Sequence, residues 1–315
     1  MILHRTGAAG LAPMGWRPIG RHLVTAALIV TAVGCWVGSG RAEVVLPERR
    51  VTARREVNGD PSLAALQAHV AGAWEAAGDS SGIEVDVSLD GGLSWTLGTR
   101  LVAAAPRRGI SMPTALFLSP NNELHLATDD RGVLYHRGSG FTPIVWDPLK
   151  VVLGVYNVDL LGYELHSIGA NPALGHVYIC STENTEDADW SSTALFSRSL
   201  DNGGTWSFPL RLSSIYSKGS NMVVGPDGSI HAAWVDYSLS QAVVRRSLDR
   251  GSTFEPPVLA GDMLDNLDVL PLGWQVPRTP YRFYPWFRDF FYAPNFPALA
   301  VDRSAGPTRG NLYLT

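Results

Sequence analysis

The stretch Ser199-Leu200-Asp201-Asn202-Gly203-Gly204-Thr205-Trp206 decides how the rest of the chain is interpreted. Its spacing, Ser-x-Asp-x-Gly-x-Thr-Trp, recurs in Ser88–Trp95, where Ser replaces Thr, and in Ser247–Phe254, where Phe replaces Trp. Three copies in one chain of 315 residues indicate a repeated structural unit.

The octet is typical of a tight β-hairpin. The Ser199 hydroxyl and the Asp201 carboxylate can bond backbone N–H groups of the turn, and Gly203 supplies the positive φ that other residues resist. Trp206 then returns the chain to an apolar layer. The turn positions are Ser88, Asp90, Gly92 and Trp95 in the first copy, Ser199, Asp201, Gly203 and Trp206 in the second, and Ser247, Asp249, Gly251 and Phe254 in the third.

Alternating apolar residues and turn residues divide the chain between the octets into four-stranded units. The clearest unit has strands at 221–224, 229–235, 242–247 and 257–260, with the third octet between its last two strands. The same template fits 166–170, 176–181, 194–199 and 209–212 in the unit before it, and it fits 63–66, 69–74 and 83–88 in the first unit. In the second unit, strands at 115–119, 124–128 and 133–137 lead to Gly138–Phe141, a degenerate octet.

The end of the chain predicts the start of a fifth unit. The segments 298–302 and 311–315 read as its first two strands, and an intact protein would cover the edge that they leave. We therefore expect a C-terminally truncated repeat fold of about four and a half units of about 40 to 55 residues each. The composition, with 32 Gly, 21 Pro, 10 Trp and only 17% charged residues, suits such an all-β fold.

Residues 1–42 are predicted to be a signal peptide. They carry Arg5, Arg17, Arg21 and Arg41, no acidic residue, and an apolar run from 23 to 37. The alternatives are an uncleaved membrane anchor and lipidation at Cys35, whose preceding residues resemble a lipoprotein box. We expect a secreted or periplasmic protein with no stable membrane span after cleavage. Residues 43–60 are then a linker or a ring-closing strand, and 61–315 the repeat domain.

The repeated octet resembles the Asp-box, or BNR repeat, of sialidases and related β-propellers. The resemblance covers 61–315 and implies an all-β propeller of four-stranded antiparallel blades, which has six blades in that family. In that family the boxes lie away from the active site, so they indicate the fold and not the catalysis.

The resemblance implies a substrate site at the opposite end of the blades, in the loops from strand two to three and from strand four to the next blade. Family sialidases hold the substrate carboxylate with three arginines and use a Tyr/Glu nucleophile and an Asp acid/base. The family's Arg-Ile-Pro motif is absent here, and Pro61–Leu66 contains no arginine. No catalytic residue is therefore assigned.

Substrate-binding candidates come from the loop Leu270–Asn295, in which aromatic residues alternate with arginines. Aromatic faces suit stacking on sugar rings, whereas the alternative is that they pack the loop as a lid or spacer. The candidates are Arg278, Tyr281, Arg282, Tyr284, Trp286, Arg288 and Asp289, together with Arg131 from the second unit. Other polar residues of these loops are Asp129, Glu183, Asp236 and Tyr237 with their neighbours.

The sequence predicts no cofactor and no metal site. The acidic segment 183–189 is better explained as a solvated loop than as a calcium site, and the histidines lack paired metal spacing. Cys180 ends an apolar run and is expected to be a buried small residue. No basic stripe indicates nucleic acid, since the formal net charge is −4.

Two functions remain open. The first is an exported exo-α-sialidase-like glycoside hydrolase acting on glycan termini, and the second is a non-catalytic propeller that binds glycans or proteins.

Overall fold

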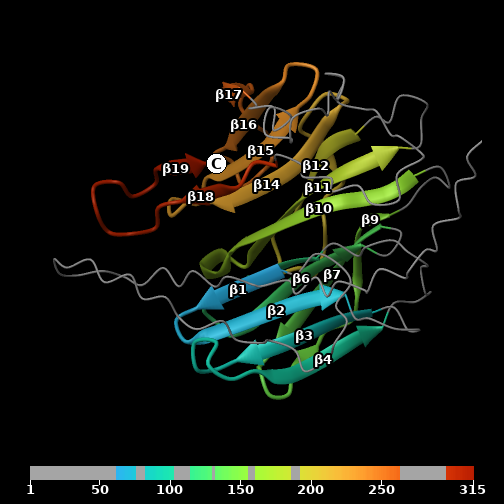
Figure 1. Cartoon of the computed structure of the whole chain (residues 1–315), viewed down its shortest axis with the longest axis vertical. Coiled ribbons are helices and arrows are strands. Elements are labelled where there is room, and N and C mark those ends of the chain that lie inside the picture. The colour runs from blue at the N-terminus through green and yellow to red at the C-terminus, as the bar shows by residue number, and fades with distance from the viewer. Residues whose placement is uncertain are drawn as a thin grey trace, which may run out of the picture. The chain divides into compact units, whose positions relative to one another are not determined.

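The computed structural model describes residues 62–75, 82–102, 114–129, 132–154, 160–185, 192–262 and 296–315. All of them belong to one compact unit, Val51–Thr315. Apart from one short 3-10 turn at Pro172–Leu174, the regular secondary structure of the described residues consists of strands. As predicted, the chain is an all-β partial propeller built from successive antiparallel sheets (Figure 1).

Each blade runs in chain order from its first strand to its last. Blade one comprises β1 (Ser62–Leu66), β2 (His69–Glu75), β3 (Gly82–Ser88) and β4 (Thr96–Val102). Blade two comprises β5 (Thr114–Leu118), β6 (Glu123–Asp129), β7 (Gly132–Ser139), β8 (Val145–Trp146) and β9 (Lys150–Gly154). Blade three comprises β10 (Leu160–Asn171), β11 (His176–Thr185), β12 (Ser192–Ser199) and β13 (Leu210–Arg211). Blade four comprises β14 (Ser217–Val224), β15 (Ile230–Asp236), β16 (Gln241–Ser247) and β17 (Val258–Asp262), and β18 (Leu299–Val301) pairs with β19 (Leu312–Leu314).

Blade two departs from the template in its outer strand. The segment predicted as a degenerate octet forms a turn, after which β8 and β9 both pair with β7. Because the turn lacks the Ser and Asp of an octet, Phe141 and Ile144 fill the space instead and pack into the apolar layer against blade one.

Apolar layers between neighbouring blades hold the sheets together. Val85 and Val87 of blade one meet Leu124 and Leu126 of blade two in the first layer. Similar layers lie between blades two and three and between blades three and four. Each fully buried Val or Leu contributes about 1.5 to 3 kcal/mol, so this packing is the main source of stability.

The octets form the same turn three times. In the second octet, Ser199 Oγ accepts the Gly203 N–H at 2.8 Å, and Asp201 Oδ1 accepts the Thr205 N–H at 2.8 Å. The Thr205 hydroxyl donates to Asp201 Oδ2 at 2.7 Å. The equivalent bonds in the other octets are Gly92 N–H to Ser88 Oγ, Ser94 N–H to Asp90 Oδ1, Gly251 N–H to Ser247 Oγ and Thr253 N–H to Asp249 Oδ1.

These bonds favour the ionised carboxylate. The backbone and side-chain bonds from Thr205, with that of Ser199, lower the pKa of Asp201 to about 2. Bonds from Ser94 and Thr253, respectively, lower the pKa values of Asp90 and Asp249 to about 2. The turns therefore keep their hydrogen bonds down to strongly acidic pH.

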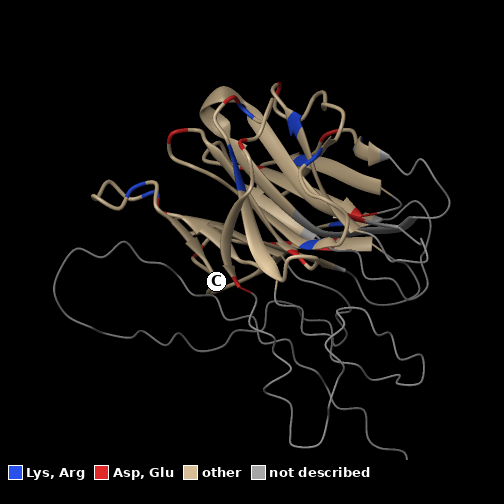
Figure 2. Cartoon of the chain, turned by 90° about the horizontal axis from the view of Figure 1, so that it is seen from above, with Lys and Arg blue, Asp and Glu red and all other residues tan. Residues whose placement is uncertain are grey.

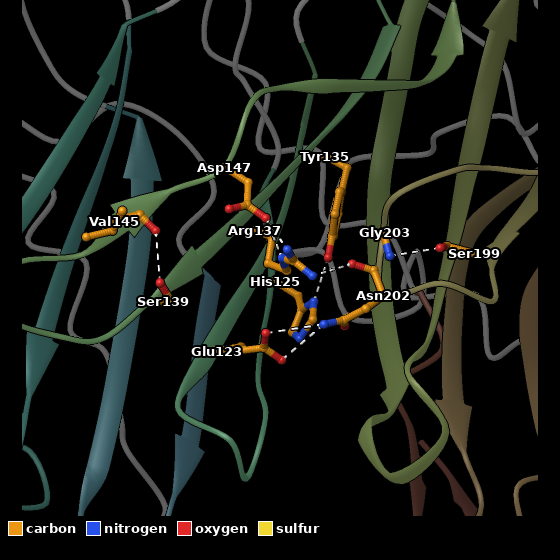
Figure 3. A network of polar contacts seen from close by, with 10 residues as sticks. All are labelled: Glu123, His125, Tyr135, Arg137, Ser139, Val145, Asp147, Ser199, Asn202 and Gly203. Atoms are coloured by element: carbon orange, nitrogen blue, oxygen red, sulfur yellow. Dashed lines mark hydrogen bonds and ion pairs between the residues drawn. The ribbon is translucent and has the colours of Figure 1, made fainter.

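A recurrent contact, which we call the blade joint, attaches each of the last two octets to the preceding blade. Figure 3 shows the joint of blades two and three. In the joint of blades two and three, the Tyr135 ring lies directly against Gly203, where a Cβ atom would overlap it. Tyr135 also meets Trp206 edge to face, with ring centroids 5.0 Å apart. Arg137, two residues along β7, donates from Nη1 to the Asn202 carbonyl at 3.1 Å.

The joint of blades three and four repeats this arrangement. The Phe196 ring lies against Gly251, and it meets Phe254 edge to face at 5.0 Å. Arg198 donates from Nη1 to the Arg250 carbonyl at 2.9 Å. In both joints, therefore, an aromatic ring packs against the octet glycine, and an arginine two positions later binds a carbonyl of the octet.

Polar contacts extend the first of these joints (Figure 3). His125 Nδ1 and the Tyr135 hydroxyl share a buried hydrogen bond of 2.7 Å, and Asn202 Nδ2 donates to Glu123 at 3.2 and 3.3 Å. Burial, aided by the nearby Arg137, lowers the pKa of His125 to about 4. His125 is therefore neutral at ordinary pH.

The joint predicts that Gly203→Ala destabilises the fold more than Gly92→Ala. Both glycines have positive φ, 85° and 89°, so both substitutions carry a backbone cost of about 1 to 2 kcal/mol. Only at Gly203 would the new Cβ strike an aromatic ring, whereas at Gly92 its nearest neighbour is Trp95 at 3.9 Å. We expect an additional loss of about 1 to 3 kcal/mol for Gly203→Ala, measured by urea denaturation. Equal losses would show that the ring contact has no energetic weight.

The buried histidine predicts that stability falls as the pH decreases from about 6.5 to 4. The unfolded chain takes up the His125 proton first, because the folded pKa is lowered to about 4. Replacing His125→Tyr together with Tyr135→Phe installs the pair Tyr178 and Phe196 found at the same positions of blade three. We expect this double variant to lose less stability between pH 7.5 and 4.5, by roughly 2 to 3 kcal/mol.

Urea denaturation at several pH values tests this. His136, whose pKa burial also lowers to about 4, stays in both proteins and leaves a residual pH dependence. Identical pH dependence in the two proteins would contradict the assignment to His125.

Candidate functional site

The ends of the blades opposite the octets, which we call the loop end, are set by the strand register. In blade four, β15 ends at Asp236 and pairs there with Gln241, the first residue of β16. At the other end of the same ladder, Ile230 pairs with Ser247, where the third octet begins. The turns from strand two to strand three therefore lie at the end away from the octets.

The predicted substrate-binding residues lie outside the described residues. This applies to Arg131 and to the whole loop set, namely Arg278, Tyr281, Arg282, Tyr284, Trp286, Arg288 and Asp289. The described residues that flank this loop, Asp262 and Phe296, both lie at the loop end. Asp262 pairs with Gln241, and Phe296 packs against Gly219 of β14.

Asp236 is fully engaged in shaping the loop end. It is buried, and its Oδ1 accepts the Ser238 N–H at 3.0 Å, the Ser238 hydroxyl at 2.5 Å and the Leu239 N–H at 3.3 Å. Its Oδ2 accepts the Ser214 hydroxyl at 3.0 Å. Because Ser214 precedes β14, Asp236 links the β15–β16 turn to the connection between blades three and four. This engagement points to a structural role.

Asp129 holds the corresponding turn of blade two. It is buried at the end of β6 and accepts the Gly132 N–H at 3.1 Å. The adjacent Thr128 hydroxyl lies 3.2 Å from His136 Nε2, and burial keeps this histidine neutral by lowering its pKa to about 4. Two of the acidic residues predicted for this end, Asp129 and Asp236, thus support the turns.

Glu183 has a different environment. It lies on β11, half-buried, with Tyr163 and Thr193 as its register partners. Burial raises its pKa, and the positive charge of Arg211 opposes that rise. A carboxyl group whose pKa rises toward neutrality is suited to proton transfer, and a nearby guanidinium is suited to an anionic ligand.

Blade one carries a polar row that the sequence analysis did not single out. Trp74, Glu84 and Arg100 are register partners across β2, β3 and β4. The alternation of β3, with Glu84 and Asp86 between aliphatic residues, predicts a strand with one face in water, yet both faces are buried. The sequence signal that could have identified this row is the pair of acidic residues, Glu84 and Asp86, on a strand that is otherwise aliphatic.

The other charged residues and the Cys180 thiol are less suited to catalysis or binding. Acidic and basic residues are interspersed over the described part of the chain (Figure 2). Cys180 is buried as expected, and burial raises the pKa of its thiol to about 12. Within the described ranges, no group of His, Cys, Asp and Glu is arranged to hold a metal ion, and no helix is long and apolar enough to cross a bilayer.

Comparison with known proteins yields structural similarity only. No protein-family model matches the sequence, and no curated protein matches it. A sialidase of Trypanosoma rangeli, solved with the inhibitor DANA, is similar with 13% identity and a TM-score of 0.43, over 62% of this chain and 37% of that one. The GH93 α-L-arabinofuranosidase of Fusarium graminearum, solved with arabinobiose, shows 13% identity and a TM-score of 0.47, over 63% of this chain and 64% of that one. A protein of unknown function from Dyadobacter fermentans shows 14% identity and a TM-score of 0.47, over 64% and 69%.

The Asp236 contacts predict that Asp236→Ala lowers the free energy of unfolding by about 2 to 4 kcal/mol, because four partly buried hydrogen bonds lose their acceptor. Asp262→Ala is a matched control, since this exposed carboxylate accepts a hydrogen bond from Gln241 alone within the described residues. Thermal unfolding measures the stability of both variants. Backbone hydrogen exchange should become faster at 237–240 and 213–216 in Asp236→Ala alone. A loss for Asp236→Ala no larger than the control's would contradict the structural role.

Proposed function

We propose that this chain is an exported, sialidase-like glycan-acting propeller whose ligand binds at the loop end of the blades. The threefold octet, which has one hydrogen-bonded geometry in all three copies and matches the spacing of Asp-boxes, supports the sialidase-like fold. The observation that carries the ligand site is the half-buried Glu183, whose pKa is raised by burial. The proposal includes a signal peptide at 1–42, a linker at 43–60 and a propeller domain at 61–315.

The chemistry available at the loop end supports this function. The half-buried Glu183 feels the positive charge of Arg211, and the segment between Asp262 and Phe296 carries the arginines and aromatics predicted to bind substrate. A guanidinium grips a carboxylate through two parallel hydrogen bonds, and aromatic faces stack on sugar rings. An acidic sugar at a glycan terminus has a carboxylate for the guanidinium and a ring for the aromatic faces.

We further propose that Glu183 exchanges the proton during glycosidic bond cleavage. Its raised pKa keeps a larger share of the carboxyl protonated than an exposed glutamate would have. Glu183 would protonate the glycosidic oxygen as its bond to the anomeric carbon breaks. Water would then supply the hydroxyl at that carbon and return its remaining proton to Glu183.

The second candidate, a glycan-binding propeller without catalysis, is favoured by one observation. β1, the first strand of blade one, has the sequence Ser-Leu-Ala-Ala-Leu and contributes no arginine. A site with fewer arginines would still bind a glycan and would lack the full grip on a carboxylate.

Turnover of 4-methylumbelliferyl α-N-acetylneuraminide by the full chain tests the proposal. We expect fluorophore release that falls by at least about tenfold in Arg282→Ala and Arg288→Ala, because each loses a charged hydrogen bond to the substrate carboxylate. Glu183→Gln should lower kcat more than it changes KM. Lys150→Ala, which removes an exposed charge from β9 of blade two, should leave turnover unchanged.

Circular dichroism of each variant establishes that it is folded. Binding of the free sugar without release of the fluorophore would favour the non-catalytic function. Neither binding nor turnover by folded protein would overturn the proposal.

A further inference from the structure

One pair of residues in the second octet is chemically labile. Asn202 and Gly203 form the only Asn-Gly pair among the residues that the structure describes. Asparagine is a thermolabile residue, and a following glycine has no side chain to shield its backbone nitrogen. That nitrogen can lose its proton to hydroxide and bond to the asparagine Cγ, which releases ammonia and leaves a cyclic imide. Water then opens the imide to aspartate or isoaspartate, so a neutral amide becomes a carboxylate.

The octet turn itself does not require asparagine at its fourth position. Gly91 and Arg250 occupy this position in the other two octets, with positive φ of 73° and 62°, and Asn202 has a φ of 57°. Asparagine tolerates this conformation, but so do the residues of the other octets. The distinguishing feature of Asn202 is its side chain, whose Nδ2 donates to both oxygens of Glu123 at 3.2 and 3.3 Å. The amide therefore serves the contact between blades two and three.

Contacts of the blade joint restrain both atoms that would react. The Gly203 N–H donates to Ser199 Oγ at 2.8 Å, so its proton is engaged. The Asn202 amide is held by Glu123 of blade two. The Tyr135 ring lies directly against Gly203, so the glycine backbone has no room to shift toward blade two. The nitrogen and the Cγ are therefore each fixed by a separate contact.

The Asn202 backbone is also fixed from two sides. Its N–H donates to the Gly175 carbonyl at 2.6 Å, and its carbonyl accepts a bond from Arg137 Nη1 at 3.1 Å. Ring closure requires the Asn202 side chain to leave Glu123 and the main chain to turn with it. These contacts must therefore break before the imide forms, which is a local opening of the joint rather than unfolding of the whole chain.

We propose that Asn202 is a latent deamidation site, which the closed joint of blades two and three protects and which opening of that joint exposes. Because ammonia is lost, the new carboxylate records the opening irreversibly. A carboxylate at this position faces Glu123 with a second negative charge and offers no donor to it. Isoaspartate, in addition, lengthens the main chain of the turn by one carbon. The converted joint therefore closes less tightly than the original one, whatever ligand the loop end binds.

Deamidation of the full chain at mildly alkaline pH tests the protection. Trypsin cuts after Arg198 and Arg211, and the released segment 199–211 contains one asparagine. Liquid chromatography with mass spectrometry measures the mass gain of this segment and separates the two products. We expect the folded chain to react at least about tenfold more slowly than a synthetic peptide of 199–211, because the peptide lacks the contacts of the joint.

Variants of the restraining residues should remove the protection. Glu123→Ala should accelerate deamidation at least about tenfold, since a hydrogen bond to a charged acceptor is lost, and Ser199→Ala at least about threefold. Glu123→Gln keeps an acceptor oxygen and should accelerate the reaction less than Glu123→Ala does. Two controls should react at the rate of the parent chain, namely Lys150→Ala on β9 and Asp236→Ala, which weakens the fold at the loop end.

Two results would overturn the protection by the joint. One is a folded chain that deamidates as fast as the peptide. The other is a Glu123→Ala rate no higher than that of Asp236→Ala, because the reaction would then follow unfolding of the whole chain and not opening of the joint.

Thermal unfolding tests the consequence for the joint. Asn202→Asp reproduces one product of the reaction. Asn202→Gly is its matched control, because it removes the amide without adding a charge and places there the glycine that the first octet has, Gly91. We expect a midpoint at least about 2 °C lower for Asn202→Asp than for Asn202→Gly. A midpoint equal to or above that of the control would contradict the weakening of the joint.

Discussion

The contact of an octet glycine with the side chain beneath it is the constraint on which the stacking of blades two, three and four depends. At Gly203 and Gly251 the backbone approaches an aromatic ring so closely that no Cβ fits. The glycine therefore has two roles at once, since its positive φ closes the turn and its missing side chain admits the neighbouring blade. The arginine two residues beyond the ring then fixes the turn from the side.

This double role explains why the first octet behaves differently from the other two. Gly92 has only Trp95 near it, and the Trp95 indole N–H bonds back to the Gly92 carbonyl at 3.1 Å. In the second octet, Trp206 turns instead toward Tyr135. The last residue of the octet therefore contacts its own turn in blade one, which no blade precedes among the described residues. In blade three, the same position contacts the preceding blade instead.

The fold was predictable because its determinants are local. Ser, Asp and Gly at fixed spacing encode the turn, and apolar alternation encodes the strands between turns, so the predicted strands of blades one, three and four overlap those observed. The fourth strand of blade one, β4, was not predicted, and β10 and β14 begin earlier than expected. Blade two was harder, because Phe141 and Ile144 replace the octet by apolar packing, which has no fixed spacing. The burial of Glu84 and Asp86 was missed for a related reason, since alternation indicates which residues share a face and not what covers that face.

The loop end follows different rules from the octet end. Octet contacts are made within eight residues or with the adjacent strand, so a short motif contains them. At the loop end, Asp236 joins a turn within blade four to the connection between blades three and four, and Glu183 takes its properties from burial and from Arg211 on another strand. A carboxyl in either place looks the same in the sequence, and only the fold distinguishes the one that braces a turn from the one with a pKa shifted toward proton transfer. The repeated end therefore maintains the scaffold, and the variable end has the chemical diversity that a binding site requires.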